Sequence, residues 1–359
     1  MFKFIIRRVI YGFLVLVGVL VVVFLLFNVL PGDPARMMLG QRADQESIKA
    51  INRDLGLDRP LMIQFIMYAN DLSPFSVHNI VDENHFLFLD NEKYTYTKLF
   101  TFAGSRAIVL KYPYLRRSYQ SKRKVSEIIS QSMPATAVLA LTSMIIATIL
   151  GIILGIISAI KKGTFFDNFN LVFSVIGMSV PSFFAALIIA WIFGYLLSDY
   201  TGLNMYGSLF TLDDYGEGEY LDLKNLILPA ATLGIRPLAV VAQLMRGSLL
   251  DVLGQDYIRT ANAKGLDFYT VIIKHALKNA LNPVITAISG WLAALMAGTV
   301  YIEMIFGWKG IGYETFKALE KYDFPVVMGT VLIIATIFVV INILVDVIYG
   351  MLDPRARVK

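Results

Sequence analysis

Charged side chains are scarce in this chain. Only 16% of its 359 residues are Asp, Glu, Lys or Arg, whereas 57% are hydrophobic. Soluble domains carry about 25% charged residues. This shortage, together with long apolar runs, argues against an ordinary soluble domain and places the chain among membrane proteins.

Cysteine is absent and histidine occurs three times. No disulfide can therefore stabilise the fold. The sequence also lacks H-E-x-x-H, G-x-S-x-G and G-x-x-x-x-G-K-[ST] motifs. It thus offers no recognisable metal or nucleophile constellation, and it cannot bind ATP through a P-loop of its own. We expect a protein without catalytic residues, metal or cofactor.

Six apolar segments are long enough to cross a bilayer as helices, because a helix rises about 1.5 Å per residue and the hydrocarbon core is about 30 Å thick. We therefore predict an all-α polytopic membrane protein with six transmembrane helices. Pro181 interrupts the third segment, which predicts a kink. The segments are Val9–Leu30, Pro134–Ile160, Phe169–Ser198, Leu226–Met245, Pro283–Ile302 and Val326–Val345.

The short loops carry their basic residues unevenly. With the N-terminus in the cytoplasm, the inner segments hold thirteen Lys and Arg residues and the short outer segments hold four. The positive-inside rule favours this orientation, and six spans then place both termini in the cytoplasm. We predict three regions: an N-terminal anchor helix (1–30), an extracytoplasmic region (31–133) and a core formed by the other five spans (134–359) with a cytoplasmic loop at 246–282.

The long loop before the second span holds fourteen basic residues, but long loops cross the membrane largely regardless of charge. Helix signals occur at 33–40, before Gly56 and after Pro60. Two strand-like runs flank Asp90–Lys93, which predicts a hairpin, and "AIVLKYPYL" offers a third strand. We expect a small extracytoplasmic α/β insert.

The stretch Gln255–Pro283 is polar and basic although its neighbours are apolar. It predicts a helix that ends at Lys264, a left-handed Gly265, and a second helix capped by Asp267. The second helix should bury one apolar face, and Pro283 should open the next span. Such a corner suits docking into a groove of another protein, but a basic helix resting on anionic lipid fits equally well. The predicted apolar face consists of Ile273, Ala276, Leu277, Ala280 and Leu281.

These residues resemble the EAA loop of binding-protein-dependent ABC importer permeases, in particular the dipeptide/oligopeptide/nickel branch. The resemblance is carried by "DYIRTANAKGL", by "RRVIYGFLVLVGVLVVVFLLFNVLPGDPAR" near the N-terminus, and by "YIEMIFGWKGIG" and "NILVDVIYGMLDPR" near the C-terminus. Ala261, Gly265 and Leu277 fit the general loop pattern, whereas Arg259 replaces its glutamate. The segment Ser73–Tyr112 departs from the branch, which has a much shorter connection there.

The resemblance implies a transport subunit of the bacterial inner membrane whose glycine corner is a coupling helix. It implies a homologous second permease, two ATPase subunits or domains that bind the ATP, and an extracytoplasmic substrate-binding protein, with no nucleic acid. The substrate would be a di- or oligopeptide, a nickel chelate or another small solute. The coupling residues would be Arg259, Thr260, Ala261, Asn262, Ala263, Lys264, Gly265 and Leu266.

Two charged residues are candidates for the translocation path. An arginine inside a span costs at least about 2.5 kcal/mol on insertion scales, so Arg236 should face a cavity or a partner. The alternative is an internal ion pair, or a hydrogen bond to a carbonyl freed by Pro229 or Pro237. Glu303, at the outer end of the fifth span, is either a gate residue or an interfacial charge that reaches water.

Small residues recur every fourth position in two segments. Gly290, Ala294 and Gly298 could contact the second permease, and Ala147, Gly151 and Gly155 have the same spacing. Such stripes let helices approach closely. Packing inside one subunit explains them equally well.

A self-energised secondary transporter or channel is the alternative function. That class is typified by inverted repeats or by several charges buried in the middle of spans. Only Arg236 fits such a pattern. Dependence of uptake on an ATPase would separate the two classes.

Overall fold

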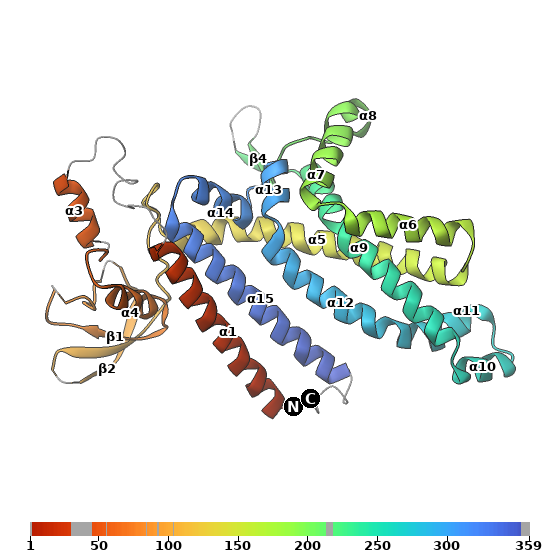
Figure 1. Cartoon of the computed structure of the whole chain (residues 1–359), viewed down its shortest axis with the longest axis horizontal. Helices are drawn as coiled ribbons and strands as arrows, with labels where there is room; N and C mark the ends of the chain where they lie inside the picture. The colour runs from red at the N-terminus through yellow and green to blue at the C-terminus, as the bar shows by residue number, and fades with distance from the viewer. Residues whose placement is uncertain are drawn as a thin grey trace. The chain divides into compact units, whose positions relative to one another are not determined.

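The computed structural model describes residues 2–29, 45–54, 56–83, 85–91, 93–102, 104–212 and 218–352. The described chain is mainly helical (Figure 1), and it forms two compact units. The first unit comprises residues 1–12, 132–313 and 336–359, and the second comprises 13–131 and 314–335. The helix expected at 33–40 lies outside the described residues.

The first unit is a helical bundle with one two-stranded hairpin. Its helix α9 contacts α6, α7, α12 and α13, and Figure 1 shows α9 and α12 running side by side. Leu139, Met245, Leu249 and Trp308 are fully buried in its core. The elements that lie wholly in this unit are α6 (Phe165–Ser179), α7 (Ser182–Trp191), the π-helix η2 (Ile192–Leu196), α8 (Ser198–Thr201), β4 (Phe210–Leu212), β5 (Glu219–Leu221), α9 (Lys224–Leu253), α10 (Asp256–Ala263), α11 (Phe268–Thr270), the π-helix η3 (Val271–Ala276), α12 (Leu277–Gly298) and α13 (Val300–Phe306).

Three long helices and one short one belong partly to each unit: α1 (Phe2–Val29), α5 (Val125–Ile160), α14 (Ile311–Glu320) and α15 (Phe324–Leu352). Two helices begin before the predicted spans. Helix α5 starts at Val125 rather than Pro134, and α12 starts at Leu277 and carries Pro283 within its second turn. The prediction that Pro283 opens the fifth span was wrong, because the chain is already helical when it reaches this proline.

Five helices within the described ranges are long and apolar enough to span a membrane. The predicted third span is instead two helices, α6 and α7–η2, bent by 109° at their junction. Val180 is extended there (φ −70°, ψ 127°), because the residue before a proline avoids the helical region and Pro181 has no N–H to donate. The predicted kink is therefore a sharp break. The five spans are Lys3–Phe27, Val125–Ile160, Lys224–Leu253, Phe268–Met296 and Phe324–Val347.

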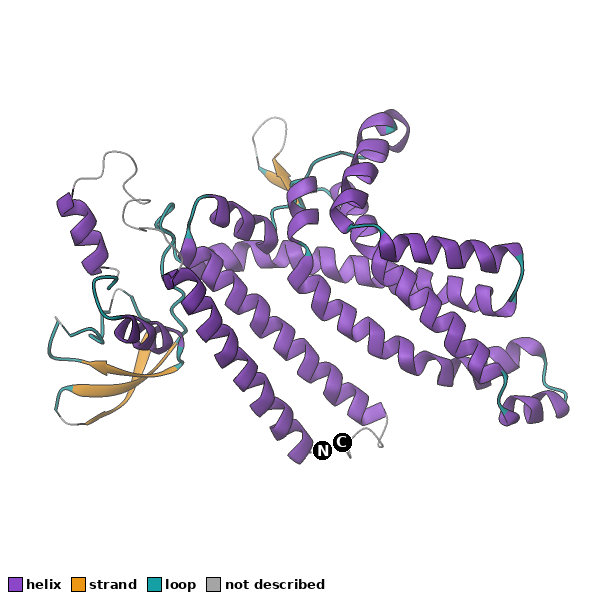
Figure 2. Cartoon of the chain, in the orientation of Figure 1, coloured by secondary structure: helices purple, strands orange, loops and turns teal. Residues whose placement is uncertain are grey.

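The second unit combines helices with an antiparallel sheet whose strand order is β1-β3-β2 (Figure 2). The hairpin joins β2 to β3, with Gly104 at φ +70° in the turn. The hairpin predicted around Asp90–Lys93 was wrong. The first predicted strand makes only an isolated bridge, from Phe88 to Asn79. The second predicted strand, β2, pairs with β3 instead, and β1 pairs with the other edge of β3. The elements are α3 (Gln45–Asp54), α4 (Leu61–Leu72), β1 (Phe75–Asn79), β2 (Tyr96–Phe102) and β3 (Arg106–Lys111).

Candidate functional site

Helix α10 presents one polar face to the outside. Ile258 and Ala261 are buried against the bundle, whereas Arg259, Thr260, Asn262, Ala263 and Lys264 are exposed. Lys264 caps the helix, and the chain then turns at Gly265 with φ +77°. L-residues with a side chain avoid this left-handed region. The predicted helix and its glycine corner are both present.

Asp267 begins the next helical segment after the corner. Its carboxylate accepts a hydrogen bond from the Thr270 backbone N–H at 3.0 Å, as a helix N-cap does. Hydrogen bonding from Thr270 lowers the pKa of Asp267 below its usual value. The cap therefore remains charged at neutral pH and fixes the direction in which the chain leaves Gly265.

The buried face of this second segment differs from the prediction. Val271 and Ile272 are buried, and Ile273 is 63% exposed. The reason is the π-helix η3, whose wider turn rotates the chain relative to a regular α-helix. Ala276 and Ala280 are buried as expected, while Leu277 and Leu281 pack at the edge of the core.

Side-chain contacts attach α10 to the membrane helices. The Asn279 side-chain amide donates to the Tyr257 hydroxyl at 2.8 Å, which links α12 to the start of α10. Ile258 and Ala261 belong to the same core cluster as Leu249 of α9. Helix α10 also packs on η3, which leads directly into α12, so α10 is joined to the membrane helix α12 by packing and by a hydrogen bond.

The corner also exposes apolar and aromatic side chains. Leu266 is 38% exposed, Phe268 53% and Tyr269 75%. They follow directly on the basic residues Arg259 and Lys264 in the chain. Arginine and aromatic side chains are enriched in protein–protein interfaces, so Arg259, Phe268 and Tyr269 favour a docking surface here.

An ion pair that the sequence did not reveal fastens α6 to α9. Arg246 donates to the Asp167 carboxylate through Nε at 2.6 Å and Nη2 at 2.8 Å, and Asp167 is 1% exposed. The Gly163 backbone N–H donates to the same carboxylate at 2.9 Å, and the Ser158 hydroxyl is a further donor. The ends of α5, α6 and α9 therefore meet at one carboxylate. In the sequence, the only indication that Asp167 is buried is its position at the start of an apolar run.

Arg236 is an exposed residue of α9. Within the described part of the chain it makes no hydrogen bond or ion pair, so neither internal partner considered for it is present. Its side chain is therefore available to a path or to a partner subunit.

Glu303 is completely buried, which corrects the expectation of an interfacial charge that reaches water. Its carboxylate accepts hydrogen bonds from the hydroxyls of Thr136 at 2.6 Å and Thr299 at 2.8 Å, and from the Tyr313 backbone N–H at 2.9 Å. A Cβ added at Gly310 would stand 2.5 Å from its Cδ. The "GWKGIG" glycines thus allow this turn to close over the carboxylate, and Glu303 connects α5 to α13.

The two stripes of small residues lie in different surroundings. A Cβ at Gly155 would stand 2.6 Å from both the Ala242 carbonyl oxygen and the Met245 Cβ, so this stripe packs on α9. A Cβ at Gly290 would meet no described heavy atom within 4 Å, and Ala294 is exposed. Gly298 ends the same helix.

The chain matches two families along most of its length. The family of the binding-protein-dependent transport system inner membrane component matches residues 151–358, and the family of its N-terminal region matches residues 1–82. The chain is 33% identical over 372 residues to the dipeptide transport system permease protein DppB of Alkalihalophilus pseudofirmus, covering 99% of this chain and 100% of that one. It is 34% identical to DppB of Escherichia coli K12, with both chains fully covered. It is also 34% identical to the di/tripeptide transport system permease protein DppB of Pseudomonas aeruginosa, covering 99% of each.

Among solved structures, the MetNI methionine ABC transporter in inward-facing conformations matches with a TM-score of 0.48 and 16% identity. The match covers 64% of this chain and 97% of that one.

Proposed function

This chain belongs to the family of binding-protein-dependent transport system inner membrane components, and from that premise we propose that it forms half of the translocation path of an ATP-driven importer for di- or oligopeptides. The observation that carries the substrate class is the end-to-end similarity to dipeptide and di/tripeptide permeases. The chain is a multi-pass permease subunit of the inner membrane, and ATP is hydrolysed by a separate subunit of such a system.

The coupling site consists of Arg259–Leu266. A separate ATPase subunit would bind this surface, which combines an exposed polar face, the left-handed Gly265 and the exposed ring of Phe268. The contacts of α10 with η3 and α12 then carry its movement into the membrane helices. This role explains why an apolar protein keeps a polar loop, and the assembly includes two ATPase subunits or domains.

A second, homologous permease completes the path. The stripe of Gly290, Ala294 and Gly298 on α12 is the proposed contact with it, because Gly290 and Ala294 are exposed and small residues let two helices approach closely. Arg236 is the proposed path residue on α9, since it is exposed and finds no partner among the described residues. A buried and fully hydrogen-bonded Glu303 fits a structural role better than a gate.

The proposed topology has six spans, with α6 and α7–η2 together as the third, both termini in the cytoplasm and residues 31–133 outside. The charge asymmetry of the short loops supports it. A cysteine at Gln120 should then react with an impermeant thiol reagent in intact cells, whereas one at Lys162 should not. The reverse labelling would overturn the orientation.

The coupling role is tested by Gly265→Val in the assembled transporter. A β-branched residue at φ +77° is strained, and a left-handed conformation costs roughly 1–2 kcal/mol even for less hindered residues. We expect the protein to insert and to retain its partners, while ATP-dependent dipeptide uptake into vesicles is lost.

Gly202→Val is the matched control. Gly202 is also left-handed, with φ +63°, and a Cβ there would meet none of the described atoms within 4 Å, but it follows α8 and lies outside the coupling loop. It should retain most uptake. Normal uptake by Gly265→Val would contradict the coupling role, and equal loss in both variants would show that backbone strain alone is responsible. Dipeptide uptake that is normal without ATP would contradict the proposed transporter class.

A further inference from the structure

Helix α4 has its polar and apolar faces reversed relative to a helix in water. Throughout α4, all of which is described, the exposed side chains are Leu61 (45%), Met62 (70%) and Ile66 (42%). None of its polar side chains is exposed. A surface helix of a soluble domain presents the opposite arrangement.

Three polar side chains of α4, those of Gln64, Asn70 and Asp71, are hydrogen-bonded within the protein. The Gln64 amide donates to the Arg59 carbonyl at 2.8 Å and to the Leu57 carbonyl at 3.2 Å. The Asn70 side-chain oxygen accepts a hydrogen bond from the Val77 backbone N–H at 3.2 Å, and the Asp71 carboxylate accepts one from the Tyr94 hydroxyl at 2.6 Å. The Tyr68 hydroxyl is buried and has no hydrogen-bond partner among the described residues, so none of the polar side chains of this helix lies on its exposed face.

The contacts of α4 with α1 fix its depth along a membrane span. The Phe65 and Tyr68 rings lie 5.1 and 5.8 Å from the Phe24 ring, and their cluster reaches back to Val19. The apolar span of α1 ends at Phe27. With a rise of about 1.5 Å per residue, these contacts lie about 4 to 12 Å inside the end of the span.

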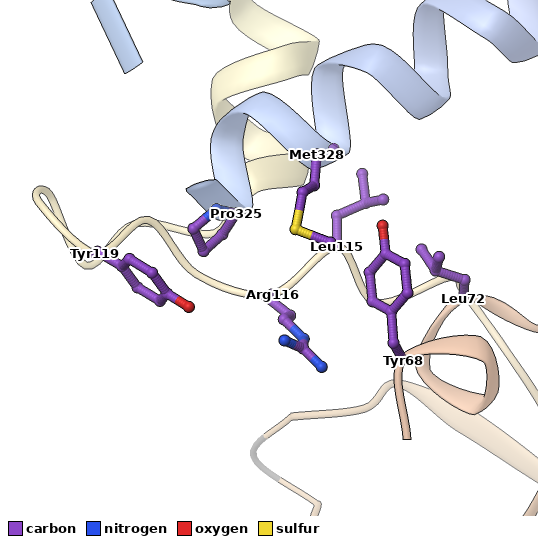
Figure 3. A pocket seen from close by; sticks show the side chains of 8 residues that line it. Tyr68, Leu72, Leu115, Arg116, Tyr119, Pro325 and Met328 are labelled. Carbon is purple, nitrogen blue, oxygen red and sulfur yellow. The ribbon is translucent and has the colours of Figure 1, made fainter. Parts of the chain in front are cut away.

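The contacts of α4 with helix α15 give a second, independent value for the depth of α4 in the membrane. The apolar span of α15 begins at Phe324, and Met328 and Leu332 pack in the same cluster as Tyr68. These two residues lie about 6 and 12 Å inside that span by helix rise. Figure 3 shows Tyr68 and Leu72 on the same side of a small cavity as Leu115, with Met328 of α15 above them.

Helix α1 also exposes apolar side chains at the depth at which α4 packs. Val22, Leu25 and Leu26 are 55%, 45% and 51% exposed at the depth at which α4 packs. Those residues belong to a membrane span, so lipid is their surrounding medium. The exposed apolar side chains of α4 lie at the same depth in the bilayer, and we therefore expect them to be covered by lipid as well.

We propose that α4 is an in-plane membrane helix whose Leu61, Met62 and Ile66 side chains are covered by the acyl chains of the leaflet at the Phe27 end of α1. An interfacial helix buries its apolar face about 5–10 Å into the acyl boundary, which agrees with both depths. The bilayer surface of this permease thus includes part of the long loop. This inference does not depend on the substrate or on the orientation of the chain.

Cysteine substitution tests the proposal directly, because the chain contains no cysteine of its own. Met62→Cys and Ile66→Cys are each labelled with a fluorophore in the full transporter and reconstituted into proteoliposomes. We expect phospholipids brominated on their acyl chains to quench both labels, and aqueous iodide to leave them bright. Glu83→Cys, at an exposed polar position of the same loop, should respond in the opposite way.

Three results would overturn the proposal. Iodide quenching of the labels at 62 and 66 that disappears on addition of the substrate-binding protein would make this face a protein-docking surface. Iodide quenching that persists with the binding protein would show that the helix lies in water. Labels that neither quencher reaches would show that another protein subunit covers them.

Discussion

Two segments of this permease carry small residues at the same spacing and use them differently. Ala147 of α5 is buried, and Gly151 and Gly155 of the same helix lie so close to α9 of the same chain that no methyl group would fit at either glycine. Gly290 and Ala294 of α12 face outward, and no described atom fills the place where a Gly290 side chain would be. The pattern indicates that two helices approach closely, but it does not indicate whose helices they are.

The charged residues likewise divide into those that contact their own chain and those that face outward. Asp167 and Glu303 are buried and bond groups of their own chain, whereas Arg236 and Arg259 are exposed. Inward-facing features should therefore be needed for the fold. Outward-facing features should be needed only for partners or for transport, and substitutions can test this difference.

The largest effect is expected from Gly155→Leu. The new side chain would collide with a backbone carbonyl of α9 and with Met245, and overpacking of a tight contact costs about 1–3 kcal/mol, occasionally more. We expect little protein to insert stably, as measured by its yield and its thermal unfolding in detergent. Gly155→Ala should show a smaller loss, and a normal yield for Gly155→Leu would contradict the packing of this stripe.

Asp167→Asn should destabilise the first unit next most strongly. It leaves Arg246 without its bidentate partner, and breaking a buried ion pair costs about 3–5 kcal/mol, although the 20% exposure of Arg246 reduces this figure. Asp256→Asn is the matched control, because its pair with Arg259 is 3.5 Å long and largely exposed. That variant should lose no more than about 1 kcal/mol. Equal melting temperatures for the two variants would refute the structural role of Asp167.

Gly290→Leu should leave the chain folded and impair assembly. The structure has room for the side chain within one subunit, so stability should change by no more than about 0.5 kcal/mol. Co-purification of the second permease should fall, and uptake with it. If yield falls and pairing does not, the stripe is an internal contact and the contrast with Gly155 fails.

The smallest effect is expected from shortening 77–107 to a few glycines and serines. This change removes most of the sheet and leaves α4 and the coupling loop in place. Basal ATPase activity and binding of the ATPase subunits should persist, while stimulation by the substrate-binding protein should weaken. We expect this because the insert and the coupling loop lie on opposite sides of the membrane in the proposed topology, which leaves the insert free to serve the binding protein. Unchanged stimulation would show that the insert does not serve the binding protein, and loss of the ATPase subunits would contradict the placement of the insert outside.

Local features of the coupling loop could be predicted from the sequence because they depend on near neighbours. A glycine after a helical run and an aspartate two positions later specify the left-handed corner and its cap. The break at Pro181 is local in the same sense. The π-helix η3 was not predictable, since one wide turn leaves no periodic signal in a short segment, and the face assigned to Ile273 was therefore wrong.

By itself the sequence determined the membrane class, the family, and the position and shape of the loop at Gly265, because hydropathy, motifs and turn chemistry act over a few residues. Only the tertiary structure decided which charges are buried, which glycines are already in contact, and which face of α4 lies outward. Asp167 and Arg246 are 79 residues apart, and Thr136 and Glu303 are 167 apart. Contacts over such distances are set by how whole helices pack, which no short stretch of sequence encodes.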